Sequence, residues 1–385
     1  MLRPSLFSTG LAALASLAAL SLSTPDALAQ RHGRRHRVRC DEGQHASGDH
    51  CCNDGEEWVP ARDACVCLAP NGCAPVVPPS PVPEAPPPPP PPRCPNGMVL
   101  IENIDFTAGA APSVTEAAAD ERPVHRVTLA PYCIDRGEVT VAQYRACAQS
   151  GSCTSLPTVN LPGLPPGQVP AWSQLCNGPR TDRDDHPMNC VDWTQADAFC
   201  RSRNARLPTE AEWEFAARGS EMRTYPWGDA PPGPDRTNAC RGACAAGLAR
   251  RGLPAPRGAM PGDDGFAETS PVGRFAPGLS PYGLSDMAGN VMEWTADWFG
   301  PYSPIPATNP TGPGFGQERV IRGGHWGSTN AADLRTTRRQ HAPPGTRLAT
   351  LGFRCVATPA EPPPPPPPPP PPVEPEPAPR RRGRR

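Results

Sequence analysis

Hydrophobic residues in the long central part of the chain come in short runs, and three of these runs begin with a helix-capping pattern. In a capping box, the side chains of the first and fourth residues bond to each other's backbone N–H groups. The three patterns are Thr140-Val-Ala-Gln143, Thr194-Gln-Ala-Asp197 and Thr209-Glu-Ala-Glu212. They predict three helices, of which the first reaches about Gln149 and the second runs through Cys200 and Arg203. In the third helix, Trp213, Ala216 and Ala217 are expected to face the core.

Strand signals are few. Alternation of apolar and polar residues predicts a short strand at Val124–Leu129, and similar patterns at Arg319–Arg322 and Gly352–Val356 predict two others. Gly, Pro, Asn and Asp recur every few residues in the remaining chain, which is typical of turns. The pattern therefore predicts a loop-rich α+β domain that needs disulfides or bound ions to hold it together.

The first 29 residues have the pattern of a secretory signal peptide. Arg3 precedes an apolar stretch from Leu6 to Leu22, and Ala27-Leu28-Ala29 supplies an A-x-A cleavage site. The stretch is short for a membrane span and is diluted by serines. We expect an exported protein, located in the periplasm, at the cell surface or outside the cell. Sixteen cysteines, all after this leader, suit such an oxidising compartment.

Composition divides the mature chain into successive parts. A basic segment at 30–39 comes before a six-cysteine segment at 40–73, which is too short to bury a sizeable core and predicts a small disulfide-rich module. A proline-rich linker follows at 74–93. The main domain covers 94–357, and residues 358–385 form a proline-rich tail that ends in arginines.

Positive charge is concentrated at the two ends. Residues 30–39 and 380–385 each contain five Arg and no acidic residue, whereas the formal net charge of the whole chain is −1. We expect these ends to contact an anionic surface, and we expect no specific nucleic-acid partner. All 37 Lys and Arg positions are Arg, which excludes lysine chemistry such as a Schiff base or a P-loop.

A series of motifs runs in order through the main domain. The longest is Arg206-Leu-Pro-Thr-Glu-Ala-Glu-Trp-Glu-Phe-Ala-Ala-Arg-Gly219. The others are Gly97-Met-Val99, Glu121-Arg-Pro-Val-His125, Tyr132-Cys-Ile-Asp135, Glu138-Val-Thr140, His186-Pro187, Val191-Asp-Trp193, Tyr225-Pro-Trp-Gly228, Asp286-Met-Ala-Gly-Asn-Val-Met-Glu-Trp294, Arg322-Gly-Gly324 and Gly352-Phe-Arg-Cys355. Together they resemble the formylglycine-generating enzymes, also called sulfatase-modifying factors, over residues 94–357. The resemblance implies that family's loop-rich variant of the C-type lectin fold.

The resemblance also implies an activity and shows where this chain departs from it. The family's oxidases convert a sulfatase cysteine to formylglycine with molecular oxygen, using a copper-binding cysteine pair between the motifs that hold Gly324 and Gly352. A thiolate pair suits soft Cu(I). Here no Cys occurs from Ala245 to Arg354, and Ser328 stands where the first cysteine would be. We therefore expect no copper, and a non-catalytic protein that uses the scaffold to bind an unidentified envelope component or protein.

Two alternatives stay open. The chain could still be a formylglycine-generating oxidase acting on protein cysteine, despite the missing pair. Different metal-dependent chemistry could also be built around His325, which replaces a residue that is usually Ser in the family, with His125, His186 or His341 as a further ligand. A pocket-lining or surface role for His325 is the simpler interpretation.

Among the cysteines, the resemblance implies one disulfide, between Cys200 and Cys355. The family's other disulfide would need cysteines near Ala217 and Thr337, and both are missing. Two further pairs are close enough in sequence to close small loops: Cys147 with Cys153, and Cys240 with Cys244. Four cysteines are left without a predicted partner: Cys94, Cys133, Cys176 and Cys190.

The resemblance further implies two structural calcium sites made of hard oxygen ligands. The first set consists of the Asp286 and Glu293 side chains and the backbone carbonyls of Gly289 and Val291. The second set consists of the Asn238 and Asp264 side chains and the backbone carbonyls of Ala239 and Phe266. The first set lies in an unbroken motif, whereas the second spans a loop that differs from the family pattern.

Overall fold

The structure is a computed structural model in which the chain forms two compact units, Met1–Pro86 and Pro87–Arg385. It describes residues 44–47, 50–53, 56–59, 64–67, 93–102, 104–154, 159–160, 164–254 and 256–360. The expected signal peptide, the basic segments and the proline runs lie outside the described residues. None of the helices in the described ranges has the length and apolar character that a membrane span requires.

The first unit contains two antiparallel hairpins within the expected disulfide-rich module. Strand β1 (Gln44–Ser47) pairs with β2 (His50–Asn53), and β3 (Glu56–Val59) pairs with β4 (Ala64–Cys67). Cys52 is buried and disulfide-bonded. The connectivity of the six cysteines in this module stays open.

The second unit includes the main domain, whose described residues form three small sheets. One has the order β14 (Val356–Ala357), β8 (Tyr132–Asp135), β5 (Met98–Ile101). Another has the order β10 (Ala307–Thr308), β7 (His125–Leu129), β6 (Ile104–Ala108). The third has the order β12 (Gln340–Ala342), β11 (Arg319–Arg322), β9 (Met292–Trp298), β13 (Leu351–Gly352).

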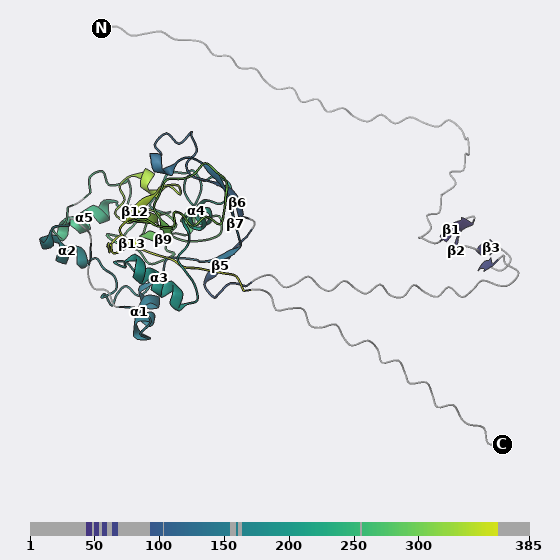
Figure 1. Cartoon of the computed structure of the whole chain (residues 1–385), viewed down its shortest axis with the longest axis horizontal. Coiled ribbons are helices and arrows are strands. Elements are labelled where there is room, and N and C mark those ends of the chain that lie inside the picture. Colours follow the sequence, from purple (N-terminus) through teal and green to yellow (C-terminus); the bar gives the residue numbers. More distant parts are fainter. Residues whose placement is uncertain are drawn as a thin grey trace, which may run out of the picture. The chain divides into compact units, whose positions relative to one another are not determined.

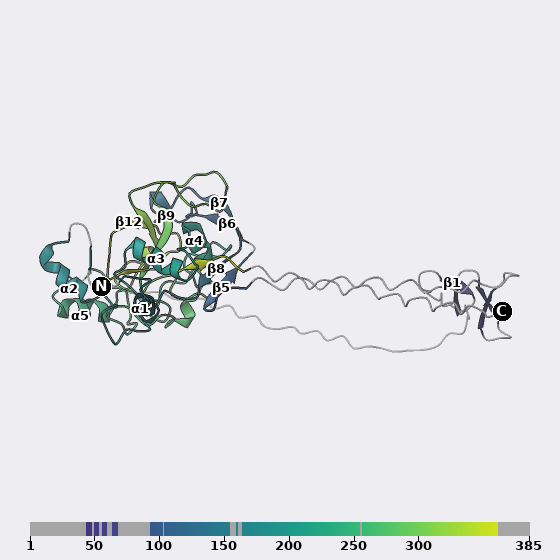
Figure 2. The ribbon, with the colours of Figure 1, turned by 60° about the horizontal axis from the view of Figure 1, so that its bottom comes forward.

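The described part of the domain also contains five short α-helices. They are α1 (Val141–Gln149), α2 (Val169–Ser173), α3 (Trp193–Ser202), α4 (Glu210–Arg218) and α5 (Gly242–Arg250). Figures 1 and 2 both show α2 and α5 side by side at one end of the domain, away from β6 and β7. The rest of the main domain is mostly loop, so the structure confirms a mixed, loop-rich α+β fold.

Helix α4 is central to the fold. Thr209 caps it as predicted: its Oγ1 accepts a hydrogen bond from the Glu212 backbone N, and the Glu212 side chain accepts one from the Thr209 backbone N. Every residue of the helix is buried, with Trp213 and Ala216 fully so. A helix that is buried on all sides must also bury its charged residues, and these need partners inside the protein.

Helix α1 begins after Thr140 as predicted, but the predicted cap of α3 is wrong. The cap is Asp192, whose carboxylate accepts from the Gln195 backbone N at 3.1 Å while the Gln195 side chain accepts from the Asp192 backbone N at 3.1 Å. Asp197, which the predicted box needed, instead forms an ion pair with Arg201 one turn later. The helix therefore begins two residues earlier than predicted.

The strand predicted at Gly352–Val356 is also wrong, because the chain changes sheets there. Strand β13 pairs in parallel with β9, whereas β14 pairs antiparallel with β8. Between them, Arg354 turns into the core to meet Glu293 of β9, and the Cys355 backbone N donates to the Asp135 carboxylate. These long-range contacts interrupt what reads as one strand.

Helices α2 and α5 were not predicted. Helix α5 starts at Gly242 and contains Gly247, and glycine inside a helix normally lowers its stability. Packing explains the second glycine, since a Cβ atom there would come within 2.7 Å of the Ala267 Cβ. The disulfide between Cys240 and Cys244 holds the first turn, so tertiary constraints compensate for weak local propensity.

Candidate functional site

The segment expected to hold the family's cysteine pair is a tight turn after β11. Two glycines open it, Gly323 with φ of 100° and Gly324 with φ of 66°, in the left-handed region that favours glycine. A Cβ atom on Gly324 would lie 2.7 Å from the Asp333 carbonyl oxygen, so the turn packs closely against the short 3-10 helix Ala331–Leu334. The glycines thus set the path of the residues that follow.

Ser328 closes this turn. Its Oγ accepts from the His325 backbone N at 3.1 Å, and its own backbone N donates to the His325 carbonyl at 2.9 Å. Its carbonyl accepts from the Cys240 backbone N at 2.9 Å. Ser328 is only 4% exposed. The hydroxyl at the expected position of the first cysteine therefore stabilises its own turn.

His325 makes its contacts within its own turn. Burial lowers the pKa of His325 to about 4, so its ring is neutral at pH 7, and its Nδ1 accepts from the Gly327 backbone N at 3.0 Å. The other three histidines have different contacts: His125 packs against the tilted ring of Tyr302, His186 contacts Arg183 and Thr269, and His341 lies against Glu318. In the described ranges, no group of three or more His, Cys, Asp or Glu side chains is arranged to hold a metal ion.

A polar cavity of about 350 Å³ lies beside the same segment. Asn330 and Arg335 line it from the segment, and Tyr225 and Glu116 line it from elsewhere in the domain. Arg335 is held in place by Glu121, whose Oε1 accepts from it at 2.7 Å. The lining includes a guanidinium, a carboxylate, an amide and an aromatic ring, which are groups that can bind polar ligands.

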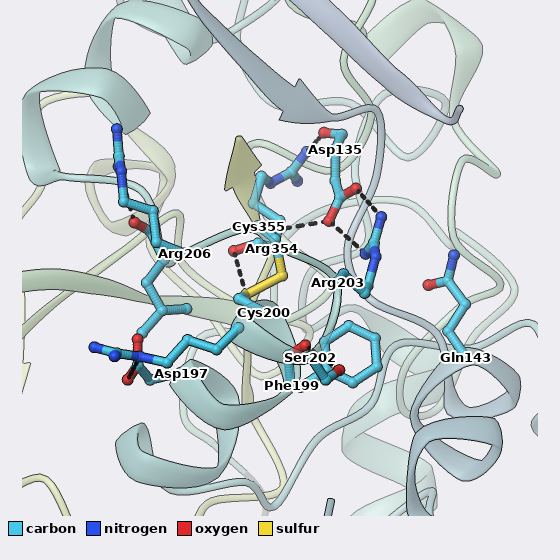
Figure 3. The surroundings of a disulfide bond; sticks show 12 residues. Asp135, Gln143, Asp197, Phe199, Cys200, Ser202, Arg203, Arg206, Arg354 and Cys355 are labelled. Atoms are coloured by element: carbon cyan, nitrogen blue, oxygen red, sulfur yellow. Dashed lines mark hydrogen bonds and ion pairs between the residues drawn. A yellow bond between two sulfur atoms is a disulfide. The ribbon is translucent and has the colours of Figure 1, made fainter. Parts of the chain in front are cut away.

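The disulfide between Cys200 and Cys355, which the resemblance implies, is present in the structure (Figure 3). Both cysteines are fully buried. Asp135 lies beside the bond and accepts from the Cys355 backbone N at 2.9 Å and from Arg203 at 3.0 and 3.1 Å. The disulfide therefore joins α3 to the last segment of the domain, and the hydrogen bonds of Asp135 lie beside it.

All ten cysteines between residues 93 and 360 are paired. Besides Cys200–Cys355, the pairs are Cys94–Cys133, Cys147–Cys153, Cys176–Cys190 and Cys240–Cys244. The two short loops proposed from spacing are thus closed, and the four cysteines left without partners pair with each other. No described cysteine carries a free thiol.

The first set of expected calcium ligands lies at the start of β9. Arg354 donates to both carboxylate oxygens of Glu293, at 2.6 and 2.7 Å, and the Trp213 indole N donates to one of them at 2.8 Å. Asp286 accepts from the Gly273 backbone N at 2.6 Å, and burial raises the pKa of Asp286. Glu293 thus already has a counter-ion, whereas Asp286 is held by neutral donors.

A third carboxylate, that of Glu138, lies near Asp286 and Glu293 and was not predicted from the sequence. Its Oε1 accepts from the Val291 backbone N at 3.0 Å. Burial raises the pKa of Glu138 well above its usual range, and the nearby Asp286 and Glu293 carboxylates add to the effect. Three buried carboxylates thus lie near the Arg354 guanidinium, which pairs directly with Glu293. The motif that contains Glu138 was visible, but its long-range neighbours were not.

The second set is brought together by the structure. Asp264 accepts from the backbone N of Ala239 and of Phe266, both at 3.1 Å, so the two chain segments meet at its carboxylate. Asn238, 1% exposed, has an Oδ1 atom that is buried without a hydrogen-bond partner. A buried acceptor of this kind is costly unless it binds something. Arg241 Nε lies 3.4 Å from the Asp264 carboxylate and offsets part of its charge.

Comparison with known proteins agrees with this architecture. A family model described as "Sulfatase-modifying factor enzyme 1-like domain" matches residues 84–359. The chain is 35% identical over 314 residues to the formylglycine-generating enzyme of Streptomyces coelicolor, which covers 73% of this chain and 95% of that protein. It is also 33% identical over 276 residues to a Bos taurus protein named "Inactive C-alpha-formylglycine-generating enzyme 2", covering 63% of this chain and 82% of that protein.

A solved structure, that of PvdO from Pseudomonas aeruginosa, superposes with a TM-score of 0.54 at 26% sequence identity, over 67% of this chain and 93% of that chain. The match extends over nearly the whole of PvdO, so the likeness concerns a complete domain. With the motifs, the fold and the family match in agreement, the chain belongs to the family of proteins with a sulfatase-modifying factor enzyme 1-like domain.

Proposed function

We propose that this protein is an exported, non-catalytic member of its family that uses the scaffold for binding in the cell envelope. The observation that carries the proposal concerns the cysteines. None occurs between Ala245 and Arg354, and all ten between residues 93 and 360 are paired in disulfides. Copper-dependent oxidation of a substrate thiol needs thiolate ligands, because soft Cu(I) selects sulfur.

Ser328 does not replace the missing cysteine. A hydroxyl is a hard, weakly acidic group that neither binds Cu(I) well nor exchanges with thiols. In addition, the Ser328 hydroxyl accepts a hydrogen bond within its own turn and is buried. We therefore assign it a structural role.

The polar cavity beside this turn is the binding site that we propose. It lies next to the segment where the family's reaction would take place, and its walls carry Arg335, Tyr225 and Asn330. The partner is an unidentified envelope component or protein. Export is supported by the leader pattern and by the five disulfides of the main domain, which form in oxidising compartments. The arginine-rich ends would add contact with an anionic surface.

Alkylation of thiols tests whether all ten cysteines of the main domain are paired in disulfides. We expect iodoacetamide, applied to the denatured but unreduced protein, to modify no cysteine between Cys94 and Cys355, because a disulfide does not alkylate. After reduction, all ten should be modified, as peptide mass spectrometry would show. A modified cysteine before reduction would identify a thiol available for catalysis and would count against the non-catalytic proposal.

We also propose that the main domain binds structural calcium. The buried Asn238 Oδ1 atom has no hydrogen-bond partner, which supports the second set of calcium ligands, although the sequence motif favours the first. The excess of carboxylates around Glu138 supports the first set. Bound calcium would supply positive charge to these buried oxygens.

Thermal melts in calcium and in chelator should therefore differ. A ligand that binds only the native state adds about 2.7 kcal/mol at a hundredfold excess over its Kd. Asp264→Asn should reduce the difference, because it removes charge at the second set. Asp263→Asn is the matched control, since Asp263 is the adjacent, exposed residue. Identical melts of the unmodified protein with and without calcium would contradict the proposal.

A further inference from the structure

A second cavity, of about 280 Å³, lies between the start of α4 and the loop that follows β9. Its buried wall includes Asp297, Glu210 and Arg339, which are 4%, 6% and 3% exposed. Its outer wall is apolar and aromatic, with Tyr302 and Ile305 among its residues. Ile305 is 71% exposed, so this wall reaches the surface. The cavity thus joins an apolar entrance to a charged interior.

Asp297 is the group in this interior whose hydrogen-bonding capacity is only partly satisfied. Its Oδ2 accepts from the Glu210 backbone N at 2.8 Å. Its Oδ1 lies close to Gly312, where an added Cβ atom would be 3.0 Å from it. No other hydrogen bond or ion pair to Asp297 is found within the described part of the chain. Asp297 lines the cavity and is nine-tenths buried, so a carboxyl that borders the cavity has one oxygen without a partner.

The arginines near Asp297 form their hydrogen bonds with other groups. Arg339 donates to both Glu210 oxygens, at 2.7 and 2.8 Å, and Arg206 donates to both oxygens of Glu212, at 2.6 and 2.7 Å. Arg319 donates to the Ala296 carbonyl at 2.6 Å. Its guanidinium also lies over two tryptophan rings, those of Trp193 and Trp298. Glu210 and Glu212 themselves face Asp297 and repel its negative charge.

The electrostatics agree with this geometry. Burial raises the pKa of Asp297 to about 8; the Glu210 and Glu212 charges add to the shift, and the hydrogen bond from the Glu210 backbone and the Arg339 charge oppose it. The carboxyl is therefore mostly protonated at pH 7 for want of a positive partner. A positive group brought to Oδ1 would supply that partner and favour the ionised form.

We propose that this cavity binds a small organic primary amine, whose ammonium group pairs with Asp297 and whose hydrocarbon body lies against the apolar outer wall. On binding, the carboxyl proton passes to solvent and the ammonium takes its place. A metal ion fits less well, because the described residues supply no group of three His, Cys, Asp or Glu ligands here. An anion would face Glu210 and Glu214, which also line the cavity. The site is separate from the polar cavity of the proposed function and does not depend on it.

Isothermal titration of the full chain with benzylamine, with benzyl alcohol as the uncharged probe of the same shape, tests the proposal. We expect benzylamine to bind and benzyl alcohol to bind at least tenfold more weakly. Because only the ionised carboxylate pairs with the ammonium, affinity for benzylamine should rise about tenfold per pH unit between pH 6 and pH 7. It should level off above pH 8. Equal binding of the two probes, or no binding of benzylamine, would overturn the proposal.

Asp297→Asn removes the charge but keeps an oxygen that can accept from the Glu210 backbone N. We expect this variant to lose benzylamine binding together with its pH dependence. Asp185→Asn, at an exposed aspartate outside the cavity, should bind as the unmodified protein does. Unchanged benzylamine binding by Asp297→Asn would overturn the assignment. If that variant fails to fold, the comparison of probes and the pH series on the unmodified protein still decide the question.

Discussion

Replacing Arg322 with methionine is expected to lower the free energy of unfolding by about 3–5 kcal/mol, the range for breaking a buried ion pair by removing one partner. Arg322 is 1% exposed and donates to Glu210 at 3.0 Å and to Glu214 at 2.8 Å, both on α4. It also donates to the backbone carbonyls of Thr336 and Thr337. The substitution would leave two buried carboxylates short of a partner.

Arg126→Met is the matched control. Arg126 pairs with Asp105, but their side chains are 68% and 46% exposed, and ion pairs exposed to water contribute little to stability. Urea unfolding of both variants, followed by circular dichroism, gives the comparison. Similar losses in the two variants would show that the Arg322 network does not stabilise the domain in the way proposed.

This network also bears on the missing second disulfide of the family. That bond would join the region of Ala217, on α4, to the region of Thr337. Arg322 connects the same two regions by hydrogen bonds, to Glu214 on one side and to the Thr337 carbonyl on the other. Arg339 adds a further link from the later segment to Glu210. The ion network thus links α4 to the segment around Thr337, the two regions that the absent disulfide would join.

Removing both Cys200 and Cys355, by changing each to alanine, should lower the free energy of unfolding by about 5 kcal/mol. The bond spans 155 residues, and in the chain-entropy model the stabilisation grows with the logarithm of the loop length. Changing both members avoids leaving a reactive thiol. Unfolding in urea without reductant provides the measurement.

The short bridge between Cys147 and Cys153 supplies the control for loop length. It spans only 6 residues, for which the same model gives about 2 kcal/mol. Removing both of its cysteines should therefore cost clearly less than removing Cys200 and Cys355. If the two double variants were equally stable, loop closure would not be the origin of the stabilisation.

The parts of the fold that sequence could predict are those set by nearby residues. The capping box at Thr209 gave α4 its start, because both partners of that box lie within one turn. Two overlapping boxes compete at α3, and the choice of Asp192 depends on Asp197 pairing with Arg201. The change of sheets near Arg354 depends on Glu293, far away in the chain, so local alternation could not indicate it.

The candidate site divides in the same way. The absence of cysteine from Ala245 to Arg354 is a property of sequence alone, and it needs no structure. The buried environment of Asp297 and the unpartnered oxygen of Asn238 arise from contacts between distant segments. The family resemblance predicted Asn238 as a calcium ligand. No motif pointed to Asp297.

Formylglycine formation is the most direct measurement of the central claim. The protein would be incubated with a peptide containing Cys-x-Pro-x-Arg, Cu(I) and oxygen, and the peptide would be analysed by mass spectrometry. An active formylglycine-generating enzyme would serve as the positive control. Because no described cysteine is free to hold copper, we expect the peptide cysteine to remain unchanged. Conversion of the thiol to the aldehyde, abolished by a copper chelator, would contradict the non-catalytic proposal and establish an oxidase.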